Sequence, residues 1–395
     1  MKLQLKSYFF CLVAMAMGGI FNSCSEDEVL PNEGKPIINY IRVTRPESSD
    51  SLITTAGQGS MVAIIGQNLQ DAQQIWFNDQ RAQLVPTYIT NTTIFTRIPT
   101  EIPGNISNQI KIIFANGDSL LHDFTVDISE PQIYSMVSEY VNAGDIATIR
   151  GNYFYEPLMV KFAGGANQEG VLAEIVSVED NLVEVTVPEG AQPGPITIIS
   201  NFGETKSDFY FRDNRNVIAS FDGTDFSGWW SSSDLIVASD PEISAISNKF
   251  LRANRELAAY SWLEFWVGDG GTILEATKNI PQQAFQTPKA YSLKFEISTL
   301  SALTNAEVRM YMGNSNDFGG SRAKENNFYI WRPNIGDLDG EWQTVVIPFE
   351  NFLLANKDLQ YNLNGYQVSF YFSSPVATTP NFALDNIRVV PNTIQ

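Results

Sequence analysis

Two stretches of this chain repeat each other, and no other feature of the sequence constrains the fold as strongly. Residues 59–77 match residues 144–162 with a constant offset of 85 positions (144 − 59, 151 − 66 and 162 − 77). Self-similarity at a fixed period marks copies of one structural unit. The sequence therefore predicts two adjacent modules of about 90 residues each, which we place at residues 36–128 and 129–212.

Each module has the pattern of a small antiparallel β-sandwich. Short runs in which apolar and polar residues alternate, such as Ile110–Phe114 and Ile196–Ile199, lie between Gly, Asn and Pro residues. A period of two is typical of strands with one buried face, and the Gly, Asn and Pro residues are typical of the turns between such strands. We therefore expect two tandem all-β domains.

A third, different domain follows at residues 214–395. Six of the seven tryptophans fall in this part of the chain: Trp229, Trp230, Trp262, Trp266, Trp331 and Trp342. Residues 291–297 and 367–372 alternate between apolar and polar positions, and no helical period is evident. The pattern predicts one large β-sandwich with an excess of aromatic side chains.

Strand alternation sorts these aromatic residues by face, because successive side chains of a strand point to opposite sides of the sheet. Within residues 259–267, 308–312 and 327–331, one phase is mostly aliphatic and is expected to be buried. That phase contains Leu263, Phe265, Val267, Val308, Met310, Met312, Phe328 and Ile330. The other phase is expected to face solvent and contains Tyr260, Trp262, Glu264, Trp266, Arg309, Tyr311, Tyr329 and Trp331.

Aromatic side chains next to planar polar groups on one sheet face suit a sugar ligand. A pyranose ring stacks its C–H bonds on indole or phenol, and its hydroxyls pair with Arg, Asn or Glu. Trp229 and Trp230 are adjacent, so one is expected to be buried, and Trp230 is taken as the available one; Trp342 is expected to lie in the core. The candidate carbohydrate-binding residues are Trp266, Tyr329, Trp331, Trp262, Arg309, Tyr311 and Trp230.

Charge and composition exclude several other functions. The chain has 25 Lys and Arg against 44 Asp and Glu, a net charge of −19, which disfavours nucleic acids and other polyanions. One histidine, His122, and two cysteines, Cys11 and Cys24, leave too few side chains for zinc sites, cysteine nucleophiles or Ser-His-Asp triads. A neutral polysaccharide is compatible with the acidic balance, and we expect a protein that is not an enzyme.

Two alternatives for the acidic residues stay open. A glycoside hydrolase needs two carboxylates about 5 to 10 Å apart, and Glu264, Glu296 and Glu325 are the candidates. Separately, Asp222, Asp225 and Asp385 could hold a structural calcium ion, although solvated turn residues would look the same in sequence. Apart from this possible calcium ion, no metal and no cofactor are expected.

The amino terminus has the features of an export signal. Lys2 and Lys6 precede the apolar run Tyr8–Phe21, which is too short to span a bilayer comfortably and is followed by Asn22-Ser23-Cys24. Residues 1–23 are therefore expected to be a signal peptide. Because Cys24 follows a small residue, the site resembles a lipobox, which implies lipidation of Cys24 after cleavage, with residues 24–35 as a lipidated tether.

The two modules resemble immunoglobulin-like IPT/TIG domains. The resemblance rests on the Pro-x-Ile opening at Pro131-Gln132-Ile133, the Gly-x-Asn turn at Gly66-Gln67-Asn68 and the later Pro-Gly at Pro193-Gly194. In the third domain, residues 341–349 and 382–389 resemble the closing strands of jelly-roll carbohydrate-binding modules. The implied fold is all-β: two tandem Ig-like (IPT/TIG) β-sandwiches followed by a jelly-roll β-sandwich.

Taken together, these features resemble the surface glycan-binding lipoproteins of polysaccharide-utilisation loci, of the SGBP-B type. The acidic run Ser25-Glu26-Asp27-Glu28 resembles the signal that sends such lipoproteins to the outer face of the outer membrane. The resemblance implies capture of xyloglucan, mixed-linkage or β-1,3-glucan by the third domain, with the repeats as spacers and a TonB-dependent transporter complex nearby. A surface adhesion or structural lipoprotein that binds protein is the main alternative.

Overall fold

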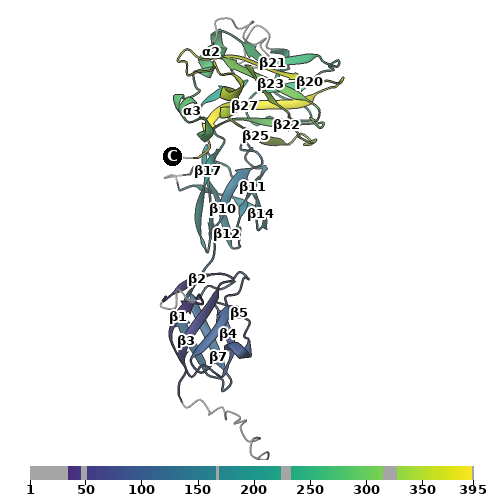
Figure 1. Cartoon of the computed structure of the whole chain (residues 1–395). Helices are drawn as coiled ribbons and strands as arrows, with labels where there is room; N and C mark the ends of the chain where they lie inside the picture. Colours follow the sequence, from purple (N-terminus) through teal and green to yellow (C-terminus); the bar gives the residue numbers. More distant parts are fainter. Residues whose placement is uncertain (1–33, 46–50, 166–168, 224–232, 315–326, 394–395) are drawn as a thin grey trace, which may run out of the picture. The chain divides into compact units, whose positions relative to one another are not determined.

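The computed structural model describes residues 34–45, 51–165, 169–223, 233–314 and 327–393. The chain divides into two compact units, Met1–Ile128 and Ser129–Gln395 (Figure 1). Within the described residues, no helix is long and apolar enough to cross a bilayer. The expected signal peptide, Cys24, the tether, Trp229 and Trp230, Asp225 and Glu325 lie outside the described residues.

The first unit is a β-sandwich in which two sheets face each other across an aliphatic core. One sheet has the order β1 (Ile37–Val43), β3 (Met61–Gln67), β6 (Thr93–Arg97); the other has the order β5 (Gln80–Ala82), β4 (Ala72–Phe77), β7 (Gln109–Phe114), β8 (Ser119–Asp123). A short parallel pair, β2 (Thr55–Gly57) and β9 (Thr125–Asp127), and one turn of 3-10 helix, η2 (Pro86–Tyr88), complete the unit. Ile64, Ile75 and Phe77 are buried between the sheets.

The second unit begins with a copy of this sandwich, so the repeat in the sequence is a repeat in the fold. Its strands are β10 (Gln132–Met136), β11 (Ile146–Asn152), β15 (Leu182–Thr186) and β14 (Glu174–Glu179) in one sheet, and β13 (Val171–Leu172), β12 (Leu158–Phe162), β16 (Gly194–Ser200) and β17 (Gly203–Phe211) in the other. Gly66 of the first copy and Gly151 of the second stand at equivalent points. A side chain at either glycine would collide with a carbonyl oxygen of the neighbouring strand, that of Ile37 or Gln132, which explains why both copies have glycine there.

The remainder of the second unit is a larger β-sandwich. Its first sheet has the order β19 (Ile236–Val237), β20 (Phe250–Asn254), β27 (Asn381–Pro391), β22 (Tyr291–Thr299), β25 (Trp342–Pro348), with β18 (Val217–Ala219) paired to β27. Its second sheet has the order β21 (Trp262–Gly268), β26 (Gln367–Ser373), β23 (Glu307–Gly313), β24 (Phe328–Trp331). The helices are short: α2 (Gly271–Thr277), α3 (Gln282–Gln286), α5 (Glu350–Ala355), η4 (Ser233–Leu235) and η5 (Pro288–Ala290).

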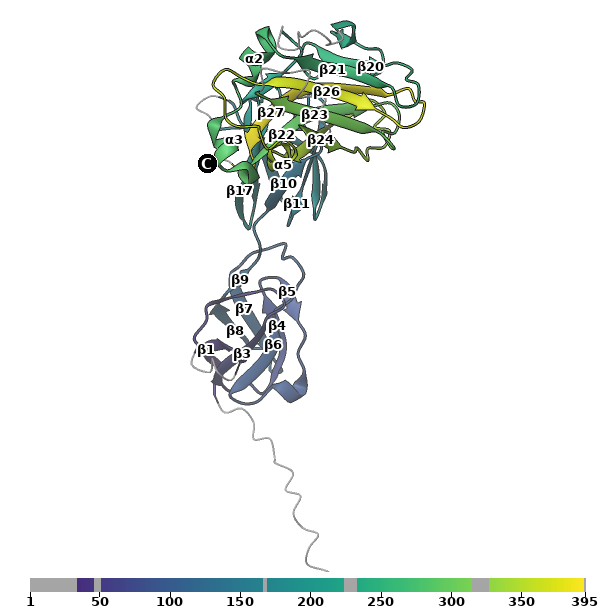
Figure 2. The ribbon, with the colours of Figure 1, turned by 45° about the horizontal axis from the view of Figure 1, so that its top comes forward.

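The core of this sandwich lies between its two sheets, which form two layers in Figure 2. Leu293, Phe295 and Ile297 of β22 meet Val308 and Met310 of β23 in one cluster of buried residues. The expected all-β fold of two Ig-like sandwiches and a jelly-roll sandwich is confirmed. Each sheet also has an outer face, and the outer faces of the two sheets differ sharply in what covers them.

Candidate functional site

The outer face of the sheet β21-β26-β23-β24 carries a row of polar and aromatic side chains. Strand register places Glu264 opposite Tyr371, Tyr371 opposite Arg309, and Arg309 opposite Ile330. Their neighbours in sequence, Phe370 and Phe372 for example, point into the core. The row therefore faces away from the core, and its members are half-buried. We call this surface the outer sheet face.

Trp262 stands at one edge of the outer sheet face. It pairs with Ser373 at the start of β21 and is 63% exposed; among the described tryptophans it alone is exposed. Tyr260, two residues earlier, is 79% exposed. Large aromatic surface left open to water costs hydrophobic stabilisation, so its presence next to polar groups indicates a contact surface.

Two arginines share one carboxylate on the same face. Glu307 accepts from Arg309 at 3.2 Å and from Arg332 at 2.7 Å, measured between guanidinium nitrogen and carboxylate oxygen. Partial burial by itself would lower the pKa of Arg309, but the neighbouring Tyr371 and Glu307 outweigh burial and raise that pKa. The arginine is thus held as a fixed, planar cation with its fork oriented by its partners.

Trp266 does not lie on this face, so the expectation for it is wrong. A β-bulge falls between Glu264 and Trp266 in the pairing of β21 with β26. The extra residue reverses the alternation, and Trp266 points into the core, fully buried against Phe370 with ring centroids 5.0 Å apart. Val267 takes the outward position instead and is itself buried.

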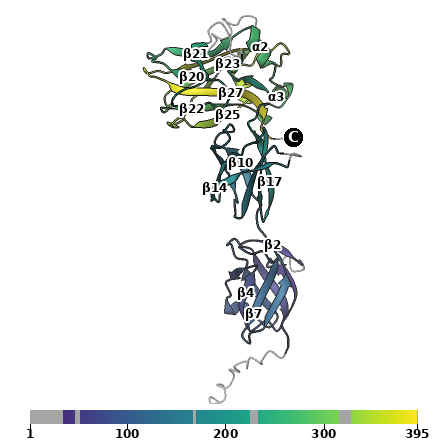
Figure 3. The same cartoon turned by 180° about the vertical axis from the view of Figure 1, so that it is seen from behind.

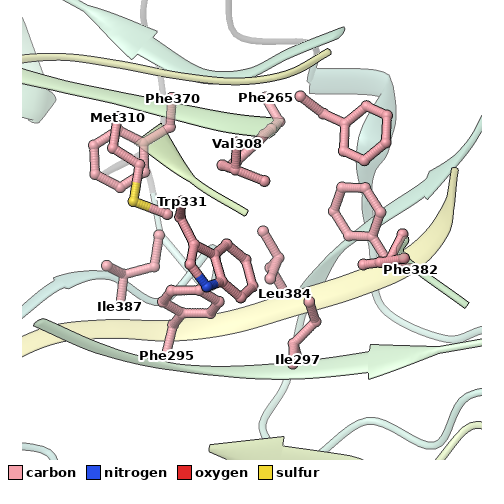
Figure 4. Close-up of a pocket in the computed structure, with 12 residues that line it drawn as sticks. Phe265, Phe295, Ile297, Val308, Met310, Trp331, Phe370, Phe382, Leu384 and Ile387 are labelled. Atoms are coloured by element: carbon pink, nitrogen blue, oxygen red, sulfur yellow. The ribbon is translucent and has the colours of Figure 1, made fainter. Parts of the chain in front are cut away.

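Tyr329 and Trp331 also point inward, in contrast to their expected position on the solvent side. Trp331 lies opposite Val308, and Tyr329 lies opposite Met310, so both share the inward phase of β23. Figure 4 shows the Trp331 indole against Phe295, at a centroid distance of 5.3 Å. The apolar cavity beside Trp331 has about 10 Å³ of free volume, too small for a sugar ring.

The outward positions of β24 belong to Phe328 and Ile330, which were expected inside. The cause is a strand made only of aromatic and aliphatic residues: with no charged or amide side chain in Phe328–Trp331, alternation gives no sign of which phase is buried. Only the pairing with β23 decides it. Phe328 extends the outer sheet face toward Tyr371, with ring centroids 5.4 Å apart.

Tyr311 has the expected phase but not the expected exposure. It shares the outer side of β23 with Arg309 and is 1% exposed, packed against Phe328 with ring centroids 5.9 Å apart. Of the predicted residues that the structure describes, Trp262 and Arg309 remain available for contact. Sequence reasoning missed Tyr371, Glu307 and Arg332; the alternation of residues 367–372 already placed Tyr371 in the polar phase.

Trp342 is buried, as expected, but it lies outside the space between the two sheets. It is 7% exposed, meets Phe250 at a centroid distance of 5.8 Å and donates its indole N–H to the carbonyl of Ser244. This places it on the outer side of β25, in a small separate cluster with Tyr140 of the second repeat.

The two candidate acids for hydrolysis that the structure describes, Glu264 and Glu296, do not form a pair. Glu264 lies on the outer sheet face, whereas Glu296 lies on the opposite side of the sandwich, with the core between them. Glu296 is fully buried, and burial raises its pKa although Arg388 opposes that effect. These two carboxylates therefore cannot flank one glycosidic bond.

The described residues contain no group of three or more acidic, histidine or cysteine side chains placed to hold a metal ion. Asp385 accepts from the Ser247 hydroxyl and from the backbone of Asn386, and Asp222 accepts from the backbone of Lys249. His122 lies in β8 opposite Ile110. Asp225, the third candidate calcium ligand, lies outside the described residues, so the calcium hypothesis stays a prediction.

Comparison with known proteins supports this description of the fold. Residues 211–391 match the family described as "Surface glycan-binding protein B xyloglucan binding domain", and residues 48–125 match the IPT/TIG domain. The crystal structure of the surface glycan-binding protein PbSGBP-B from Prevotella bryantii is similar, with a TM-score of 0.68 and 26% identity, covering 91% of this chain and 99% of that one.

An IPT/TIG domain-containing protein of Bacteroides ovatus is 30% identical over 140 residues. That match covers 34% of this chain and 28% of the relative, so this chain matches about a quarter of the length of that protein. These matches assign two parts of the chain. Residues 211–391 belong to the surface glycan-binding protein B xyloglucan binding domain family, and residues 48–125 belong to the IPT/TIG domain family.

Proposed function

We propose that this protein binds a neutral β-glucan on the outer sheet face of its large sandwich, without catalysing a reaction. The observation that carries the proposal is the exposed indole of Trp262 beside the row Glu264, Tyr371 and Arg309. Indole supplies a surface for stacking, and the carboxylate, phenol and guanidinium supply partners for hydroxyl groups.

The charge of the face favours a neutral ligand. Among its charged members, Glu264 and Glu307 balance Arg309 and Arg332. A uronate or sulfated chain would gain nothing from a balanced surface and would meet the net charge of −19 of the whole protein. The family description names xyloglucan, which makes it the first polysaccharide to test; mixed-linkage and β-1,3-glucan come next.

The shape of the face favours an extended chain and disfavours catalysis. The cavity inside the sandwich is too small for a sugar, and the second described carboxylate on the face, Glu307, is already paired with Arg309 and Arg332. An open sheet face holds a polymer from one side and leaves its glycosidic bonds accessible to enzymes. Capture for uptake is the role that such a surface serves.

We place the protein on the outer face of the outer membrane, anchored by lipid on Cys24. Support comes from the sequence alone: the apolar run after Lys2 and Lys6, the Ser23-Cys24 junction and the acidic residues that follow. Partnership with a TonB-dependent transporter complex is part of the same proposal. Globomycin treatment of the host, which blocks processing of lipoproteins, should cause the precursor to accumulate, and Cys24→Ala should remove the protein from the membrane fraction.

A binding panel tests the function. The protein from Ser25 to Gln395 is run through native gels that contain xyloglucan, barley β-glucan, laminarin, xylan, mannan or pullulan. One β-glucan should retard the wild type and Tyr88→Ala, an exposed aromatic of the first unit, whereas Trp262→Ala should run free. Retardation by none of the six would contradict the proposal and favour the alternative in which the surface binds protein.

A further inference from the structure

In the first sheet of the large sandwich, the outer side of β22 and β27 is buried, although a free sandwich would expose it to water. In β22, Lys294 and Glu296 face outward. They alternate with the inward residues Leu293, Phe295 and Ile297. Lys294 is 6% exposed and Glu296 is 0% exposed. Figure 3 shows β27, β22 and β25 side by side in this layer. Something outside the sandwich covers their outer side, and the contacts identify it as the second repeat.

Glu139, just after β10 of the second repeat, enters a cluster of charges on this side. Its carboxylate accepts from Lys294 at 2.5 Å and from Arg388 at 2.6 Å, and Arg388 also donates to Glu296 at 2.8 Å. The cluster has two carboxylates and two cations, all at most 8% exposed. With the second repeat in place but without the Glu139 carboxylate, this cluster would have two buried cations and one carboxylate.

Backbone contacts join the same two parts. The amide of Thr344 in β25 donates to the carbonyl of Val137 at 2.8 Å, and the amide of Glu139 donates to the Thr344 hydroxyl at 2.7 Å. The Ser138 hydroxyl lies 3.1 Å from the Glu296 carboxylate. The guanidinium of Arg388 lies 5.0 Å from the centre of the Tyr140 ring. These contacts attach β25 and the buried charges of the sandwich to the second repeat.

The first repeat does not have the side chain that makes these contacts. Met136 pairs with Ile149 in the second repeat as Ile41 pairs with Ile64 in the first. Three residues after Ile41 stands Thr44, where the second repeat has Glu139. The two copies share a fold, but only the second has the carboxylate that the buried cations require.

We propose that the second repeat is the fixed base of the large sandwich, and that Glu139 locks the two into one cooperative folding unit. The partner that fits this sheet face is residues 129–212 of the same chain. Removing one member of a buried charge set leaves the remaining charges unpaired in a poorly solvated place, which is strongly destabilising. The repeats then differ in role: the second supports the sandwich, and the first does not.

Hydrogen exchange of the protein from Ser25 to Gln395, followed by mass spectrometry, tests the proposal. Ile149→Ala in the second repeat is compared with Ile64→Ala, its counterpart in the first; both isoleucines are fully buried. Glu139→Gln is compared with Glu174→Gln, a substitution of an exposed carboxylate in the same repeat. Amides of β22, β25 and β27 report on the sandwich.

If the second repeat and the large sandwich fold as one cooperative unit, Ile149→Ala and Glu139→Gln should each accelerate amide hydrogen exchange in β22, β25 and β27 by more than about tenfold. Ile64→Ala and Glu174→Gln should leave those strands unchanged. If Ile149→Ala unfolds the second repeat while the sandwich keeps its protection, or if Glu139→Gln leaves the sandwich strands as they are, the proposal is wrong. The readout needs no ligand, so it is independent of the proposed function.

Discussion

At the scale of single residues, the candidate site depends on which aromatic side chains reach solvent. Trp262 and Trp266 are four residues apart in one strand, yet one is 63% exposed and the other 0%. The same indole side chain thus has two different roles in one strand. The exposed indole offers a surface to a ligand, and the buried one fills the core against Phe370.

Substitution of these two tryptophans should separate the two uses. Trp266→Ala removes a large buried side chain and should lower the free energy of unfolding by about 3–5 kcal/mol. Trp262→Ala should lower it by less than about 0.5 kcal/mol, because the side chain is mostly in water. Denaturant titrations of both variants provide the check. Similar losses for the two variants would contradict the placement of Trp266 in the core.

Asp385 gives the protein a dependence of stability on pH. Burial raises its pKa to about 8, with Asp222 and Glu296 adding to the effect and bonds from Ser247 and Asn386 opposing it. Between the ordinary pKa of a free carboxyl and this value, the folded state holds a proton that the unfolded state has lost. Stability should therefore fall as pH rises from 5 to 8, by up to about 1.4 kcal/mol per unit.

Asp385→Asn mimics the protonated carboxyl and cannot lose a proton. The variant should therefore lack the contribution of Asp385 to the pH dependence of the free energy of unfolding. The variant should lose less stability than the wild type between pH 5 and 8, as measured by urea unfolding at several pH values. Equal slopes for the two proteins would show that Asp385 is ionised in the folded state. Ser247→Ala, which removes the hydroxyl partner at 2.5 Å, provides a control for the loss of the hydrogen bond alone.

At the scale of elements, two strands decide how much of the site could be predicted from the sequence. Along β23, alternation correctly separates Val308, Met310 and Met312 from Arg309, because each apolar residue has a polar or amphipathic neighbour. In β21 a bulge after Glu264 breaks the period, and nothing in the local sequence marks it. In β24 all four residues are aromatic or aliphatic, so only the partner strand sets the phase.

The shared carboxylate between β23 and the end of β24 should matter for binding more than for stability. Glu307→Ala removes the partner of Arg309 and Arg332, which are 32% and 66% exposed. Surface ion pairs contribute little, so the free energy of unfolding should change by less than about 1 kcal/mol. Affinity for the β-glucan should fall about three- to tenfold, since Arg309 loses the contact that orients its guanidinium. Calorimetric titration of Glu307→Ala, with Glu174→Ala as the control, measures this; equal affinities would exclude a role for the pair.

At the scale of the whole molecule, the sequence predicted three sandwiches and their order, since the repeat period and the strand patterns are local features. It did not predict that the outer side of one sheet is occupied by the second repeat. That contact joins Glu139 to Lys294 and Arg388, residues 155 and 249 positions away. Pairings at such separations depend on the folded chain and leave no periodic signal.

The two sheets of the large sandwich differ in whether the second repeat covers their outer side. The second repeat occupies the outer side of β22 and β27, and the outer sheet face on the other side of the sandwich remains the candidate surface for a polymer. A chain that begins at Ser129 should consequently bind the β-glucan with the affinity of the longer protein, within about twofold, because the first unit makes no part of this face. Calorimetry on both proteins provides the check, and a loss of more than about tenfold would assign the first unit a share in binding.

A crystal structure of the protein with a xyloglucan oligosaccharide tests the proposed binding surface most directly. We expect a pyranose ring stacked on the indole of Trp262, with hydroxyl groups bonded to Arg309, Tyr371 or Glu264. Sugar bound at another surface, with Trp262 uncovered, would contradict it.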